Sequence, residues 1–186
     1  MLGAVPFAGI TSTGQSTAQA VTTSAAQLVI NGGTAMPTTA TRAGNPAVRP
    51  DVSNNRLIFN APGIFRVALN CVGVAASALQ TTFQLRKNGS SGTTISGVSK
   101  ETWATTPSTH SAFFVVEITA ADLPAAGGQS AFSDPDSTAG AGKPAGGFAG
   151  AGAAPKSGVP VDVLVTGNGS VNLTLSDVRF EAEQIG

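Results

Sequence analysis

The chain has 186 residues, of which 30 are Ala, 23 are Gly and 38 are Ser or Thr, while only 11% are charged. It is poor in the Glu, Lys, Arg and Leu that dominate coiled coils and long helices, so we expect strands rather than helices. Ten acidic and ten basic residues balance, which argues against nucleic-acid binding, and one His and one Cys are too few for a structural zinc site or a disulfide framework.

The amino-terminal segment carries few large residues. Its first fourteen residues, MLGAVPFAGITSTG, have no positively charged n-region and only a short apolar stretch, so we expect neither a signal peptide nor a membrane span. Residues 1–19 are small, polar and unpatterned, and they predict an N-terminal arm. Phe7 and Ile10 are the exceptions; we interpret them as contacts to a partner protein, with a disordered terminus as the alternative.

Residues 20–186 have the length of one β domain with its own hydrophobic core. Residues 20–30 form a Val/Leu/Ile run that ends at the turn Asn31-Gly32-Gly33, which is typical of a strand. Residues 34–55 contain several Pro, Gly and Asn residues and predict a long surface loop with short extended pieces at most.

The clearest alternation lies between residues 57 and 89. After a Pro62-Gly63 turn, every second residue from Phe65 to Cys71 is apolar, which predicts a strand with one buried face. A second alternating run, 82–86, stops at Asn88-Gly89, a dipeptide suited to a tight hairpin because both residues tolerate positive φ. We expect these two runs to be neighbouring antiparallel strands.

Residues 90–110 are rich in Ser, Thr and Gly and contain Trp103, which we interpret as a partner contact, with core packing as the alternative. The strand predicted for residues 111–119 is apolar on both faces, as expected for a strand between two layers or against another chain. We predict that its second face, Phe113 and Val115, forms a subunit interface, with burial inside the chain as the alternative.

Residues 125–158 differ from the rest of the chain. Nineteen of these 34 residues are Ala or Gly, too small to offset the entropy of ordering by their own packing, so we predict an insert loop that is mobile or ordered by a partner. Beyond the insert, strong alternation returns and predicts three closing strands, over residues 159–165, 171–175 and 178–180.

Side chains that carry chemistry are few and scattered along the sequence. His110 has no His, Cys or close carboxylate pair near it in sequence, so we interpret it as a solvated residue at a loop edge. Cys71 alternates in phase with apolar residues and predicts a buried structural thiol. Asp134 and Asp136 are too few oxygen ligands for calcium and are typical of a turn. We therefore predict no enzyme, no cofactor and no metal.

Several of these runs resemble a known family. Residues 59–67, FNAPGIFRV, resemble the strand pair F-x-x-P-G-x-Y/F-x-V of tumour-necrosis-factor-like and complement-head-like jelly rolls, and residues 85–89, LRKNG, resemble the hairpin that follows it there. Residues 114–123 resemble the strand before the family's L-x-x-G-D turn, although the Gly is missing. The resemblance covers residues 20–186 apart from the insert. The predicted strands and turns already indicate an all-β antiparallel sandwich with an insert loop and an N-terminal arm, and the resemblance implies that this sandwich is a jelly roll.

Domains of this shape usually assemble as threefold trimers, and similar viral jelly rolls serve as capsid decoration or cement proteins and as fibre tips. The small-residue composition resembles bacteriophage structural proteins. The resemblance implies a virion protein, made in the host cytoplasm, that binds the major capsid protein as a homotrimer and stabilises the outer shell, with neither nucleic acid nor membrane as a partner. The alternative is a receptor-binding or tip module of a phage tail or head fibre.

Overall fold

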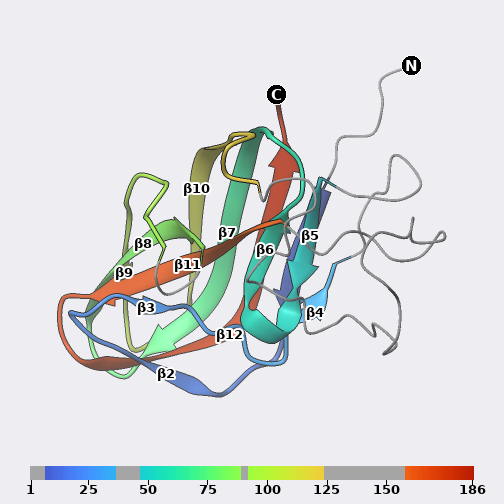
Figure 1. Ribbon diagram of the computed structural model, residues 1–186. Coiled ribbons are helices and arrows are strands. Elements are labelled where there is room, and N and C mark those ends of the chain that lie inside the picture. The colour runs from blue at the N-terminus through green and yellow to red at the C-terminus, as the bar shows by residue number, and fades with distance from the viewer. Residues whose placement is uncertain (1–6, 37–46, 89–91, 124–157) are drawn as a thin grey trace, which may run out of the picture.

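The computed structural model describes residues 7–36, 47–88, 92–123 and 158–186, which form two stacked antiparallel sheets (Figure 1). Within these ranges the only helix is a short 3-10 turn, η1 (Val52–Asn54). The strands are β1 (Phe7–Ser12), β2 (Ala18–Val21), β3 (Ala26–Gln27), β4 (Thr34–Ala35), β5 (Val48–Asp51), β6 (Arg56–Phe59), β7 (Gly63–Ala75), β8 (Leu79–Lys87), β9 (Ser99–Trp103), β10 (Ser108–Ile118), β11 (Val159–Gly167) and β12 (Val171–Gln184).

Each sheet contains six strands. Sheet A has the order β10-β7-β12-β1-β4, with β2 also paired to β12; sheet B has the order β5-β6-β11-β8-β9, with β3 also paired to β11. All the pairings are antiparallel. The predicted all-β antiparallel sandwich is therefore confirmed.

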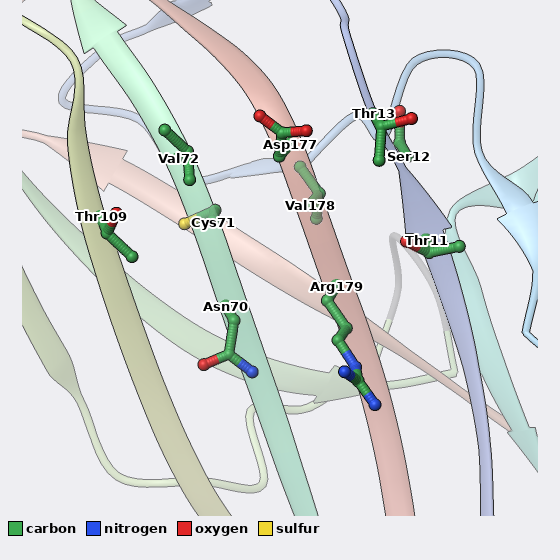
Figure 2. Close-up of a pocket in the computed structure, with 10 residues that line it drawn as sticks. All are labelled: Thr11, Ser12, Thr13, Asn70, Cys71, Val72, Thr109, Asp177, Val178 and Arg179. Carbon is green, nitrogen blue, oxygen red and sulfur yellow. The ribbon is translucent and has the colours of Figure 1, made fainter.

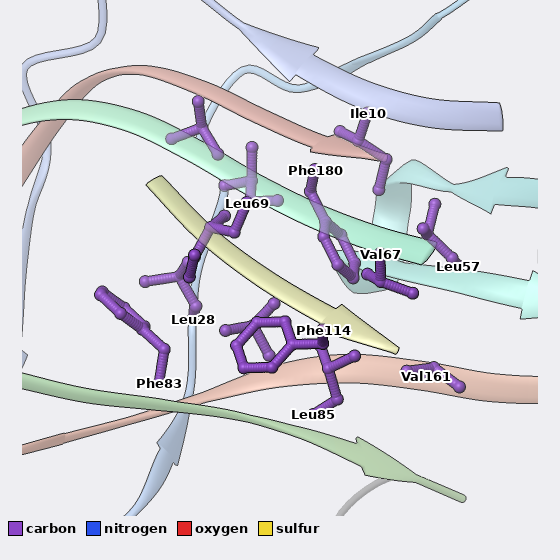
Figure 3. Packing of buried hydrophobic residues seen from close by; sticks show 14 of the residues in the cluster. Ile10, Leu28, Leu57, Val67, Leu69, Phe83, Leu85, Phe114, Val161 and Phe180 are labelled. Carbon is purple, nitrogen blue, oxygen red and sulfur yellow. The ribbon is translucent and has the colours of Figure 1, made fainter. Parts of the chain in front are cut away.

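The core lies between the inner faces of the two sheets (Figure 3). Strand β7 shows why the sequence specifies this arrangement: Phe65, Val67, Leu69 and Cys71 point into the core, so one face of the strand is buried. The rings of Phe59 and Phe65 meet edge to face, with their centroids 4.7 Å apart. The buried position of Cys71 confirms the structural thiol predicted from the alternation.

The prediction that the runs at 65–71 and 82–86 are neighbouring strands is wrong. Strand β7 pairs with β10 and β12 in sheet A, whereas β8 pairs with β9 and β11 in sheet B, so the short connection between β7 and β8 passes from one sheet to the other. Alternation identifies a strand but not its partner, because both strands simply turn an apolar face to the same core.

The closing segment differs from prediction in the number of strands. Residues 171–184 form the single strand β12, and its pairing with β7 shifts register between Leu175 and Asp177. Such a β-bulge inserts one residue into a continuous strand and changes the phase of its alternation. The phase change at Ser176 is what suggested a break between two strands.

The predicted N-terminal arm is also corrected by the structure. Residues 7–12 form β1, which lies between β12 and β4 in sheet A, and Ile10 is fully buried in the core. The small residues of this segment allow close packing, since a Cβ on Gly9 would come within 2.8 Å of the Phe180 carbonyl oxygen. Of the predicted insert at 125–158, residues 125–157 lie outside the described residues.

Candidate functional site

The outer face of sheet A carries an exposed apolar surface. Phe113 and Val115 lie on β10, the strand at one end of the sheet, and are 64% and 66% exposed. Ile64, on the neighbouring β7, and Ile185, whose backbone N–H donates to the Ile64 carbonyl oxygen at 2.8 Å, are also exposed. We call these four residues, Ile64, Phe113, Val115 and Ile185, the apolar patch.

The apolar patch is bordered by charged side chains. Strand register places Arg66 between Val115 of β10 and Glu183 of β12, and Arg66 forms an ion pair with Glu183. One row further along, Arg179 pairs with Glu181. An apolar surface with a charged rim is the pattern expected of a protein–protein contact.

A shallow groove lies on the same outer face, toward its other end (Figure 2). It crosses strands β10, β7, β12 and β1, with a volume of about 180 Å³, and it contains the bulged segment of β12. Its lining includes Thr11, Asn70, Thr109, Asp177 and Arg179. Although these polar residues border it, the accessible surface inside the groove is almost wholly apolar.

The outer side of sheet B carries a row of alternating charge. Asp51, Arg56, Asp162 and Arg86 occupy paired positions on β5, β6, β11 and β8. Arg56 donates to Asp51 at 2.6 Å, and Arg86 binds Asp162 through two hydrogen bonds. A cavity of about 380 Å³ lies beside this row. Because the two cations and two anions compensate one another, we assign the row to holding four strands together.

A chain of polar side chains links the edges of the two sheets. Glu101 of β9 accepts a hydrogen bond from His110 Nδ1 of β10 at 2.9 Å, and His110 Nε2 lies 2.8 Å from Ser108 Oγ. The indole ring of Trp103 lies against the imidazole, with centroids 4.0 Å apart. The interpretation of His110 as a solvated loop-edge residue is therefore wrong: it lies in a strand and its side chain is only 12% exposed.

The sequence did not reveal this series of hydrogen-bonded side chains, because Glu101 and His110 are nine residues apart and lie in strands of different sheets. The signal available in the sequence was a spacing of two residues within each pair. In a strand this spacing places Ser99 on the same face as Glu101, and Ser108 on the same face as His110.

Two negative findings concern the described residues only. Within residues 7–36, 47–88, 92–123 and 158–186, no three His, Cys, Asp or Glu side chains come together as a metal site. In the same part of the chain, no helix has the length and apolar character needed to cross a membrane.

Comparison with known proteins finds similarity at the level of the fold. No protein-family model matches the chain, and no curated protein matches it. A solved structure described as "Structure of Eiger TNF from S. frugiperda" is similar, with a TM-score of 0.54 over 97% of this chain and 94% of that chain. The chain has a tumour-necrosis-factor-like jelly-roll fold. The sequence identity in this comparison is 9%, so the likeness of the two jelly rolls concerns the fold alone.

The predicted contact residues fall into two groups in the structure, exposed and buried. Phe113 and Val115 are exposed together on the outer face of sheet A. Trp103 is 1% exposed and Ile10 fully buried, so neither is a partner contact in this structure, and that prediction is corrected. Both pack between the sheets because each points to the inner face of its strand. For Phe7 the structure describes the strand position, in β1, and not the side chain.

Proposed function

We propose that this chain is a structural virion protein: a capsid decoration or cement protein that binds the outer shell as a homotrimer and stabilises it. Its strand motifs resemble tumour-necrosis-factor-like jelly rolls, a shape that viral decoration proteins share, and its small-residue composition resembles phage structural proteins; both support a virion role. The observation that carries the assembly role is the exposure of Phe113 and Val115 beside a charged rim. The role requires binding and no chemical step.

The apolar patch gives the proposed trimer its driving force. Burial of apolar surface contributes about 25 cal/mol per Å², and a stable protein–protein contact covers roughly 800 Å² per partner. The four patch residues supply the apolar centre of such a contact, and the Arg66–Glu183 and Arg179–Glu181 pairs supply its polar rim. A trimer seated over a junction between shell subunits would add contacts that resist separation of those subunits.

The oligomer is tested by replacing Phe113 and Val115 together with Glu. Because both side chains point to solvent in the single chain, the variant should keep the circular dichroism spectrum of the folded wild type while the mass by light scattering falls from trimer to monomer. Its melting temperature should fall only by the amount that association adds. Val98→Glu is the matched control, since Val98 is 52% exposed outside the apolar patch. A wild-type chain that is already monomeric, or a double variant that keeps the trimeric mass, contradicts the proposed interface.

The location is tested by mixing purified protein with shells that lack it and imaging the product. Saturable density at threefold or quasi-threefold positions on the shell is expected of a cement protein. The second candidate, a receptor-binding or fibre-tip module, would use the shallow groove of Figure 2 as its binding surface. Binding to host cells or to isolated surface glycans, without binding to shells, would establish that candidate instead.

A further inference from the structure

Four polar side chains form a hydrogen-bonded relay at one edge of the sandwich. Ser99 Oγ donates to Glu101 Oε1 at 3.2 Å, Glu101 Oε2 accepts from His110 Nδ1 at 2.9 Å, and His110 Nε2 lies 2.8 Å from Ser108 Oγ. We call Ser99, Glu101, His110 and Ser108 the Ser108 relay. Its two halves come from β9 and β10, which lie at the edges of sheets B and A.

The partners of the imidazole define its proton positions when it is neutral. An ionised carboxylate only accepts hydrogen bonds, so Nδ1 carries the proton that Glu101 Oε2 receives. The neutral ring then has its lone pair on Nε2, and the Ser108 hydroxyl donates to it. This is the order carboxylate, imidazole, hydroxyl that activates a serine for acyl transfer.

The surroundings hold this arrangement in place. The Trp103 ring lies against the imidazole, and Trp103 is itself fixed by a hydrogen bond from its Nε1 to Thr81 Oγ1 at 2.8 Å. Ser99 Oγ donates a hydrogen bond to the second carboxylate oxygen of Glu101. Cys71 lies opposite His110 in the pairing of β7 with β10, and it is buried between the two sheets. A preorganised site requires side chains whose positions are fixed by packing and by hydrogen bonds to further residues.

We propose that Ser108 is a nucleophile that accepts the acyl group of a small carboxylic ester, with His110 as its general base and Glu101 as the residue that positions His110. This activity goes beyond the proposed structural role, which uses none of these residues.

The steps balance without any further reagent than water. Ser108 Oγ forms a bond to the acyl carbon while its proton moves to His110 Nε2, and the ester C–O bond breaks as Nε2 returns that proton to the departing alkoxide, releasing an alcohol. Water then attacks the acyl-serine by the same route: its proton passes to Nε2 and on to Ser108 Oγ. The second step releases a carboxylic acid and restores the free serine.

Ser108 is partly exposed, and it lies opposite Gly73 in the pairing of β10 with β7. A Cβ at Gly73 would come within 3.1 Å of Trp103 Cζ3, so the indole lies close to the backbone across from Ser108. Because β10 is an edge strand, alternate N–H groups of its backbone point away from β7, where they can donate to a developing oxyanion. A small acetyl ester is therefore a suitable probe of Ser108.

The experiment uses the full-length protein and two probes, a fluorophosphonate and p-nitrophenyl acetate. The fluorophosphonate should add one label per chain, mapped by peptide mass spectrometry to Ser108, and p-nitrophenyl acetate should release nitrophenol with a burst. Ser108→Ala should abolish the label, and His110→Gln should slow labelling about 100-fold, the scale of general-base catalysis. Ser111→Ala is the matched control, because Ser111 lies on the same strand but donates to Asn70 Oδ1 at 2.8 Å and not to an imidazole.

The role of Glu101 is tested by Glu101→Gln. The Gln amide can donate to Nδ1, which moves the imidazole proton to Nε2 and removes the base. The labelling rate should fall and lose its rise with pH, while the melting temperature shows how much of the chain remains folded. A purely structural role for Glu101 would change the melting temperature and leave the rate per folded molecule and its pH profile as in the wild type.

Three outcomes overturn the proposal: no label on folded wild-type protein, a label on Ser111 or another serine in place of Ser108, or equal labelling rates in the wild type and His110→Gln. None of these bears on shell binding, so this proposal and the structural role can fail separately.

Discussion

Arg86 binds Asp162 across the paired strands β8 and β11 with two parallel hydrogen bonds, Nε to Oδ1 at 3.0 Å and Nη2 to Oδ2 at 2.7 Å. Both side chains are largely buried on the outer side of sheet B, 13% and 3% exposed. On its other flank, Asp162 is paired in register with Arg56. The carboxylate in the middle of the sheet thus lies between two cations, and its loss leaves buried positive charge without a counterion.

Asp162→Asn should therefore lower the free energy of unfolding by about 3 kcal/mol, the scale measured when one partner of a buried ion pair is removed. Urea denaturation followed by circular dichroism measures the change. The control is Arg179→Gln at the exposed Arg179–Glu181 pair, which should cost less than about 1 kcal/mol because water screens that pair. Equal losses in the two variants would contradict the assignment of the buried row to stability.

Trp103 offers a second test of the core, because it is the only Trp in the chain and its Nε1 donates to the buried Thr81 hydroxyl. Trp103→Phe removes both the donor and part of the buried volume, so we expect a loss of about 2 kcal/mol in unfolding free energy. Thr81→Val and the double variant complete a mutant cycle, and a coupling near zero would show that the hydrogen bond contributes nothing. Wild-type fluorescence should shift to longer wavelength on unfolding.

Cys71 should be inert in the folded protein. Burial in the core, together with the Glu101 carboxylate, raises the pKa of its thiol to about 12, so the reactive thiolate is scarce at pH 8. A thiol reagent such as dithionitrobenzoate should not react with native protein at pH 8 and should react with one thiol per chain after denaturation. Rapid reaction of the native protein would mean that the core opens at Cys71.

Asp122 should contribute to the acid dependence of stability. A hydrogen bond from Lys87, followed by hydrogen bonds from the Thr119 backbone and hydroxyl, lowers the pKa of Asp122 from 3.8 to about 2. Because the folded pKa is the lower one, this contribution is present above about pH 4 and disappears as pH falls toward 2. The difference in unfolding free energy between the wild type and Asp122→Asn should shrink over that interval. A difference that stays constant would contradict this role of Asp122.

The strands themselves were predictable where alternation is strict. Phe65 to Cys71 on β7 and Val159 to Val165 on β11 lie where their patterns place them, because a period of two puts alternate side chains on one face of any strand. Asn88, at the predicted hairpin, does adopt a left-handed conformation, with φ of 67°. Pairing was not predictable in the same way, as the separation of β7 and β8 into different sheets shows.

Composition and periodicity by themselves determined that this is a β-sandwich, that Cys71 is buried, and that Phe113 and Val115 lie together on the second face of their strand. These properties depend on neighbours along the chain, and a sequence records those directly. Only the tertiary structure decided that Ile10 and Trp103 are core residues, that Asp162 lies between two arginines, and that Glu101, His110 and Ser108 meet. Those contacts join strands brought together by sheet order and register, which are set by packing the whole chain.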